Sequence, residues 1–171
     1  MSKHAAATNV SPELTNLHHY EELDARPRLR GRIHLGAAFV SVAALAWLVG
    51  VAATPRAELA AWVYGLSAIA CYATSGIYHV FARSPVARRR WRQADHAMIY
   101  VLIAGTATPM YLLAASGMWR WVMFGLMWAG AGVGITLKLV SIERFRVAGG
   151  VLYIGLGWMG LALIPNFWDR P

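Results

Sequence analysis

Five long apolar segments, separated by short polar turns, constrain this chain more than any other feature. An α-helix needs about 20 predominantly apolar residues to cross the hydrocarbon of a bilayer. Only helices and closed barrels leave no backbone polar group unpaired there. Composition agrees, because the 171 residues are 58% hydrophobic and 14% charged, whereas soluble domains are about a quarter charged. The sequence therefore predicts an all-α, polytopic membrane bundle of five helices, at about residues 33–53, 58–82, 95–115, 119–140 and 147–164.

The basic residues predict how this bundle is oriented. The polar tail of residues 1–32 and the turn after the second segment hold most of them, whereas the loops on the opposite side hold Arg56 and Arg120. Cytoplasmic loops collect Lys and Arg, so we expect a multi-pass protein of the cell membrane with a cytoplasmic N-terminus. Because the basic residues flank the membrane segments, the net charge of +8 does not require a nucleic-acid partner. We expect membrane lipids to be the partners. The membrane domain of residues 33–165 ends in a short tail, 166–171.

Several ionisable residues are expected at one depth, near the cytoplasmic face. His34 begins the first segment, His79 ends the second, and Asp95 and His96 begin the third. Ser75 precedes His79 by four residues and therefore shares its helical face. Asp95 and His96 differ in direction by about 100°, so only one can face the others. We expect this to be Asp95, because apolar residues at helical spacing continue its face.

This set of side chains is compatible with a metal site, but spacing alone leaves the question open. Imidazole and carboxylate groups suit zinc, and a catalytic zinc usually has three protein ligands and a water. His79 would be a ligand, Asp95 would be a ligand or hold the water as general base, and Ser75 would orient one of the partners. In the alternative interpretation, the histidines lie at the interface and Asp95 forms an ion pair with Arg92.

Other residues carry structural predictions. Pro109 removes a backbone donor inside the third segment, and the hydroxyls of Thr106 and Thr108 are expected to compensate. The pattern Gly130-xxx-Gly134 predicts close approach of another helix. Cys71 is the only cysteine, and we expect it to be a small apolar residue of the core.

These motifs together resemble the hemolysin III family, which is grouped with the progestin and adiponectin receptors and is distantly related to alkaline ceramidases. The likeness extends from about Pro27 to Pro165. It rests on Ser75-xxx-His79, Asp95-His96 and Ala104-Gly-Thr-Ala-Thr-Pro109, and also on Arg28-Leu-Arg-Gly-Arg-Ile-His34, Lys138 and Leu152-Tyr-Ile-Gly-Leu-Gly-Trp158.

The resemblance implies a seven-helix fold with a cytoplasmic N-terminus. It also implies a zinc near the inner leaflet, bound by one histidine of the second helix and two of the seventh. Carried over to this chain, His79 is the first ligand, Asp95 holds the water and Ser75 lines the site. Members of the family are associated with hydrolysis of lipid amides such as ceramide, with membrane homeostasis or with haemolysis.

The chain departs from the family at its C-terminal end. The sixth and seventh helices have no counterpart, and no His-xxx-His pattern occurs. Three interpretations remain. The chain lacks catalysis, or a second copy or separate helices complete the site in trans, or His34 replaces a missing ligand in a His34–His79–Asp95 site.

We therefore expect a hemolysin III-like membrane protein in which zinc-dependent hydrolysis of lipid amides is impaired. The competing hypothesis is a non-enzymatic membrane protein that affects bilayer integrity or membrane homeostasis, as in cytolysis.

Overall fold

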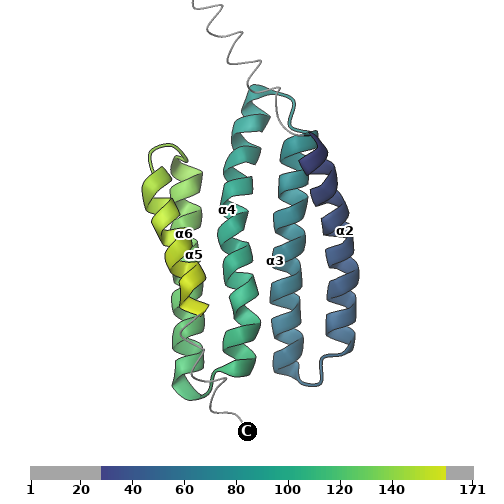
Figure 1. Cartoon of the computed structure of the whole chain (residues 1–171), viewed down its shortest axis with the longest axis vertical. Coiled ribbons are helices and arrows are strands. Elements are labelled where there is room, and N and C mark those ends of the chain that lie inside the picture. The colour runs from purple at the N-terminus through teal and green to yellow at the C-terminus, as the bar shows by residue number, and fades with distance from the viewer. Residues whose placement is uncertain (1–27, 161–171) are drawn as a thin grey trace, which may run out of the picture.

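The computed structural model describes residues 28–160, which form five α-helices and one short π-helical turn. Figure 1 shows α4 in the middle, with α3 and then α2 side by side on one side of it, and on the other side α5 with α6 in front of it. Each helix packs against its neighbour in the sequence. The elements are α2 (Arg28–Gly50), α3 (Pro55–Val80), α4 (Pro85–Pro109), η1 (Met110–Ala114), α5 (Gly117–Val140) and α6 (Arg146–Met159).

The helical, multi-pass architecture predicted from the sequence is confirmed. Within the described residues, four helices are long and apolar enough to cross a membrane: Leu29–Gly50, Pro85–Ala114, and all of α3 and α5. The described part of α6 has 14 residues, and the predicted end of the fifth segment, at 164, lies outside the described residues. So do residues 1–27 of the N-terminal tail and the C-terminal tail. The cytoplasmic location of the N-terminus stays a prediction.

Two dipeptides explain why α3 and α4 begin where they do. Thr54 and Ser84 are extended N-cap residues whose hydroxyls accept hydrogen bonds from the backbone N–H three residues later, at 3.1 and 3.2 Å. Pro55 and Pro85 follow in the first helical turn, where a missing N–H costs nothing. The third predicted segment, which begins at Asp95, is thus part of a longer helix, α4. This helix begins ten residues earlier, and its first turns are basic rather than apolar.

Glycines let α2, α3 and α4 approach one another closely. A Cβ on Gly31 of α2 would lie 2.7 Å from the Cβ of His79 on α3, and a Cβ on Gly76 would lie 2.6 Å from Leu35 Cγ. On α4, a Cβ at Gly105 would overlap Ser67 of α3. These contacts bring the backbones of the three helices together around the predicted site.

The close approach predicted from Gly130-xxx-Gly134 is also observed, and the partners belong to the same chain. Tyr100 of α4 packs on Gly134, and Leu156 of α6 packs on Gly130. The Tyr100 hydroxyl donates a hydrogen bond to the Gly149 carbonyl of α6 at 2.8 Å. The core between α4, α5 and α6 therefore forms around the glycine face of α5.

The chain changes its helical pitch at Pro109, where α4 gives way to η1. The Thr108 hydroxyl donates to the Ala104 carbonyl at 2.7 Å and accepts from Trp128 Nε1 at 3.1 Å. The carbonyl that Pro109 leaves without its helical donor is that of Gly105, so the predicted compensation is not observed at Thr108. Thr106 makes no hydrogen bond within the described residues, and its exposed side chain lines two cavities described below.

Candidate functional site

The predicted site residues line one cavity of about 210 Å³ between α2, α3 and α4. The cavity lies toward the end of the molecule where α2 and α4 begin and α3 ends, at the top of Figure 1. Three helices supply its lining, which consists of Arg30, His34, Cys71, Tyr72, Ser75, His79, Asp95 and Ile99. The fold therefore brings together the imidazoles, hydroxyl and carboxylate that the sequence places far apart.

A hydrogen bond joins α2 to α3 inside this cavity. His34 Nδ1 and Ser75 Oγ are 2.8 Å apart, and Ser75 is 6% exposed. The His34 ring also meets the Tyr72 ring edge to face, with ring centroids 5.7 Å apart. The glycine contact at Gly31, one turn before His34, holds the two helices near enough for this bond.

Asp95 rather than His96 faces the cavity, in agreement with the spacing argument. The His96 ring instead lies beside its own helix, where Nδ1 donates to the Arg92 carbonyl at 2.9 Å. The expected alternative of an Asp95–Arg92 ion pair is wrong, because Arg92 Nη1 lies 2.7 Å from Glu143 Oε1. Within residues 28–160, Asp95 has neither an ion pair nor a hydrogen bond. An ionisable residue of a membrane helix without a partner is a candidate for a functional position.

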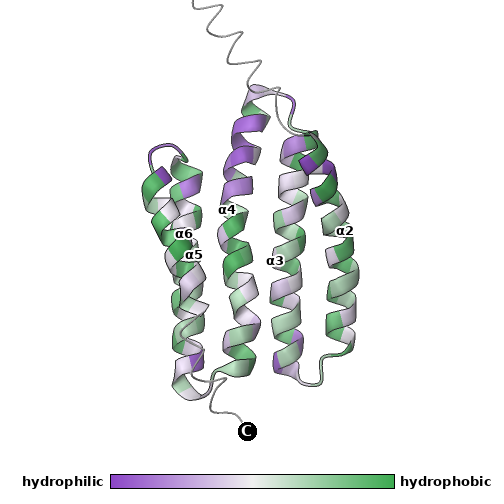
Figure 2. Ribbon diagram, viewed as in Figure 1, coloured by the Kyte–Doolittle hydropathy of each residue, from purple (hydrophilic) through white to green (hydrophobic). Residues whose placement is uncertain are grey.

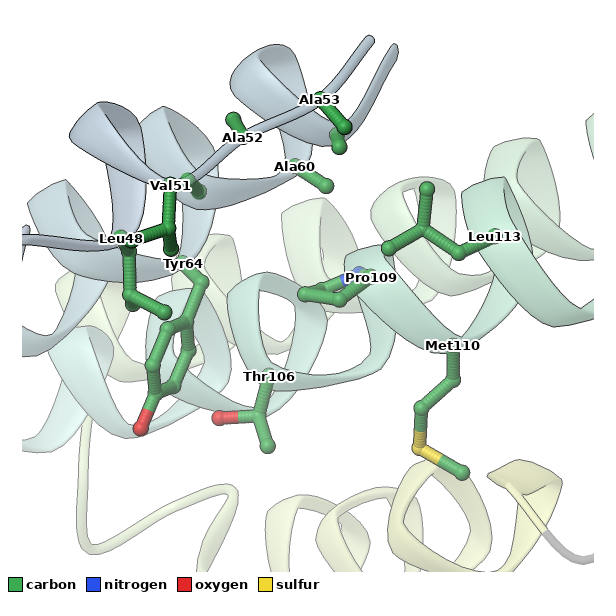
Figure 3. A pocket seen from close by; sticks show the side chains of 12 residues that line it. Leu48, Val51, Ala52, Ala53, Ala60, Tyr64, Thr106, Pro109, Met110 and Leu113 are labelled. Carbon is green, nitrogen blue, oxygen red and sulfur yellow. The ribbon is translucent and has the colours of Figure 1, made fainter.

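Beyond the polar cavity, the same face of α4 continues toward the opposite end of the molecule. Leu102, Thr106 and Met110 follow Asp95 and Ile99 at helical spacing and line two further cavities. One, of about 300 Å³, lies between α4, α5 and α6. The other, of about 540 Å³, lies between α2, α3 and the end of α4. In Figure 3, Tyr64 and Thr106 supply the hydroxyls of this second lining, which is otherwise apolar.

The sequence of this membrane bundle was compared with those of known families and proteins. Residues 24–170 match the model of the family described as Haemolysin-III related. The chain belongs to this family. It is 33% identical over 117 residues to "Hemolysin-3" of Bacillus cereus, which covers 68% of this chain and 53% of that protein. It is also 30% identical over 97 residues to "Hemolysin-3 homolog" of Bacillus subtilis (strain 168), covering 57% of this chain and 45% of the other.

The haemolysin-III related chain thus spans about half the length of these relatives. No solved structure matches it. The family resemblance predicted from the sequence is therefore confirmed. The activity of the longer relatives is only proposed for this chain, in the next subsection.

The zinc implied by the resemblance can be tested against the donor atoms. Two imidazoles, a carboxylate and a thiol line the cavity, and all are groups that zinc accepts. However, no three such side chains within residues 28–160 lie close enough together to hold a metal ion. The described residues therefore bring donor types that zinc accepts into one cavity, but not a complete set of ligands.

Arg30, Cys71 and Tyr72 line the cavity but were not predicted as site residues, although helical spacing indicates Arg30 and Cys71. Cys71, expected in the apolar core, is half-buried and lines the cavity one turn before Ser75, which itself precedes His79 by one turn. Arg30 precedes His34 by four residues and lines the same cavity. Extending each predicted face by one turn would have found them.

Proposed function

We propose that this cavity is the reactive site of a zinc-dependent hydrolase for lipid amides and that the chain supplies only part of it. The observation that carries the proposal is the meeting of His34, Ser75, His79 and Asp95, from three helices, in one cavity. These residue types match the serine, histidine and aspartate of the family motifs. The coarser statement, a haemolysin-III related membrane protein, stands independently of this chemistry.

The residues of this chain have distinct roles in the proposed site. His79 is a metal ligand, and a zinc ion held there would supply the Lewis acidity that polarises an amide carbonyl. Asp95, which has no partner within residues 28–160, accepts a proton from the attacking water as general base and returns it to the nitrogen of the departing amine. Ser75 and His34 orient each other through their hydrogen bond, so the hydroxyl stays directed into the cavity.

The set of ligands can be completed in two ways. A second copy or separate helices in trans would provide ligands from outside residues 28–160, or His34 would turn from Ser75 to give a His34–His79–Asp95 site. Until one of these happens, we expect hydrolysis to be weak. The apolar face of α4 beyond Asp95 would hold the acyl chain of the substrate.

Hydrolysis of a fluorescent lipid amide by the full chain in lipid vesicles tests the proposal. We expect zinc-stimulated hydrolysis that falls about 10²–10⁴-fold in Asp95→Asn, because a general base contributes roughly this factor. His79→Gln should lose the zinc response. His96→Gln is the matched control, since this neighbouring imidazole faces away from the cavity, and it should retain full activity. Equal activity in all three variants would contradict the proposal.

A second candidate is a non-enzymatic protein that disturbs the bilayer. Two observations favour it: the metal ligands within residues 28–160 are too few, and both relatives carry hemolysin names. Release of a trapped dye from vesicles measures this activity. Release by both wild type and Asp95→Asn, without hydrolysis by either, would support the second candidate over the first.

A further inference from the structure

We propose that the end of the molecule where α2, α4 and α6 begin is a docking surface for the headgroups of anionic phospholipids. We call it the basic end. It carries the arginines that begin or precede these three helices, whereas the carboxylates at this end within residues 28–160 are Asp95 and Glu143. Figure 2 shows the hydrophilic residues concentrated on the first turns of α4. At the opposite end the described charged residues are Arg56, Glu58 and Arg120.

The length of α4 places this surface at the depth of lipid headgroups. The continuous helical stretch Pro85–Ala114 has 30 residues, which span about 45 Å at 1.5 Å per residue. The hydrocarbon core of a bilayer is about 30 Å thick. About ten residues of an untilted helix would therefore project from it, and the polar and basic turns of Pro85–Gln93 are the ones that can do so without burying charge.

Two of the α4 arginines are available to a ligand. Arg88 Nε is directed to the Ala82 carbonyl at 3.4 Å, and Arg92 is paired with Glu143. Arg89 and Arg90 are exposed, and within residues 28–160 neither makes a hydrogen bond or an ion pair. Their guanidinium groups present free donors in the geometry that suits phosphate oxygens.

The surroundings of these arginines favour a lipid over another polyanion. Phe81 and Val86, on either side of the turn before α4, are 57% and 63% exposed. Apolar side chains beside arginines suit the boundary between headgroups and acyl chains, and they would be left in water against nucleic acid. The N-termini of α2, α4 and α6 lie at this end together with the C-termini of α3 and α5, so the helix dipoles largely cancel and the positive potential comes from the arginines.

Native mass spectrometry of the purified full chain in neutral detergent tests the proposal. The chain is titrated with phosphatidylglycerol or with phosphatidylcholine, and the bound lipid is measured. We expect tighter binding of phosphatidylglycerol. The double variant Arg89→Gln/Arg90→Gln should weaken it about five-fold for each arginine removed, or roughly 30-fold in all, from the energy of one basic residue at an anionic surface.

Two controls keep the result specific. Arg89→Lys/Arg90→Lys keeps the charge and should retain most of the binding. Arg56→Gln removes one charge from the opposite end and should leave it unchanged. Equal binding of the two lipids, an equal loss in Arg56→Gln, or tighter binding of a short DNA duplex than of phosphatidylglycerol would overturn the proposal.

Discussion

Replacement of Gly31 by alanine tests whether close packing of α2 on α3 holds the cavity together. The new Cβ would lie 2.7 Å from His79 Cβ and 2.7 Å from Val80 Cγ2, whereas carbon atoms pack best at about 3.5–4.0 Å. A Cβ atom is fixed to its backbone, so a rotamer change of His79 cannot relieve the overlap. The two helices must separate by about 1 Å.

The cost of this separation can be set against the gain from alanine. Overpacking costs about 1–3 kcal/mol, and replacing glycine by alanine inside a helix returns up to about 1 kcal/mol. Subtracting the full gain leaves a net loss of up to about 2 kcal/mol, which corresponds to a fall of up to about 8 °C in the midpoint of thermal unfolding for a chain of this size. A 1 Å displacement would also stretch the 2.8 Å His34–Ser75 bond beyond hydrogen-bonding distance.

Gly36→Ala on the same helix is the matched control. Nothing lies within 4 Å of a Cβ built at Gly36, so this variant should be as stable as the wild type or slightly more stable. Thermal unfolding in detergent, followed by circular dichroism, compares the two. Equal midpoints for Gly31→Ala and Gly36→Ala would refute the packing argument.

Two further predictions concern other parts of the bundle. Thr108→Val leaves the Trp128 indole N–H without its acceptor at 3.1 Å, which should cost about 1–3 kcal/mol and lower the unfolding midpoint; an unchanged midpoint would mean that this bond is unimportant. At Glu143, its own backbone N–H and then the Arg92 guanidinium lower the pKa of the carboxyl below its ordinary 4.5. The stabilisation that follows is present above the ordinary pKa and is lost as the pH falls through the lowered one. Wild type should therefore unfold at a slightly higher temperature than Glu143→Gln at neutral pH, and the difference should vanish in acid; a difference independent of pH would contradict this.

The helices and four residues that line the cavity, His34, Ser75, His79 and Asp95, could be predicted because both depend on local patterns. Apolar length marks the spans, and spacing of four residues relates Ser75 to His79 on one helical face. The direction of Asp95 followed from the same periodicity. By contrast, α4 begins at Pro85 because of a capping hydroxyl and a proline, and a search for apolar length alone does not detect those polar first turns.

Contacts between distant segments could not be predicted in this way. His34 and Ser75 are 41 residues apart in the sequence, and Arg92 and Glu143 are 51 apart. Such pairs depend on the distance between two helices and on the rotation of each helix about its axis. The glycine contacts fix both, but only once the helices have packed. For the same reason the sequence suggests only nearby Asp95 as a partner of Arg92, in the alternative interpretation, and not a residue of the α5–α6 turn.

The central claim is that the cavity between α2, α3 and α4 is a partial zinc site in which His79 is a ligand. Titration of zinc into the metal-free, purified full chain, with His79→Gln and His96→Gln as a matched pair, tests it most directly. The account predicts that His79→Gln weakens zinc binding more than about ten-fold, since even residues that only support a ligand contribute 10–100-fold, and that His96→Gln binds as the wild type does. Equal binding by the two variants, or no zinc binding by any of the three proteins, would contradict it.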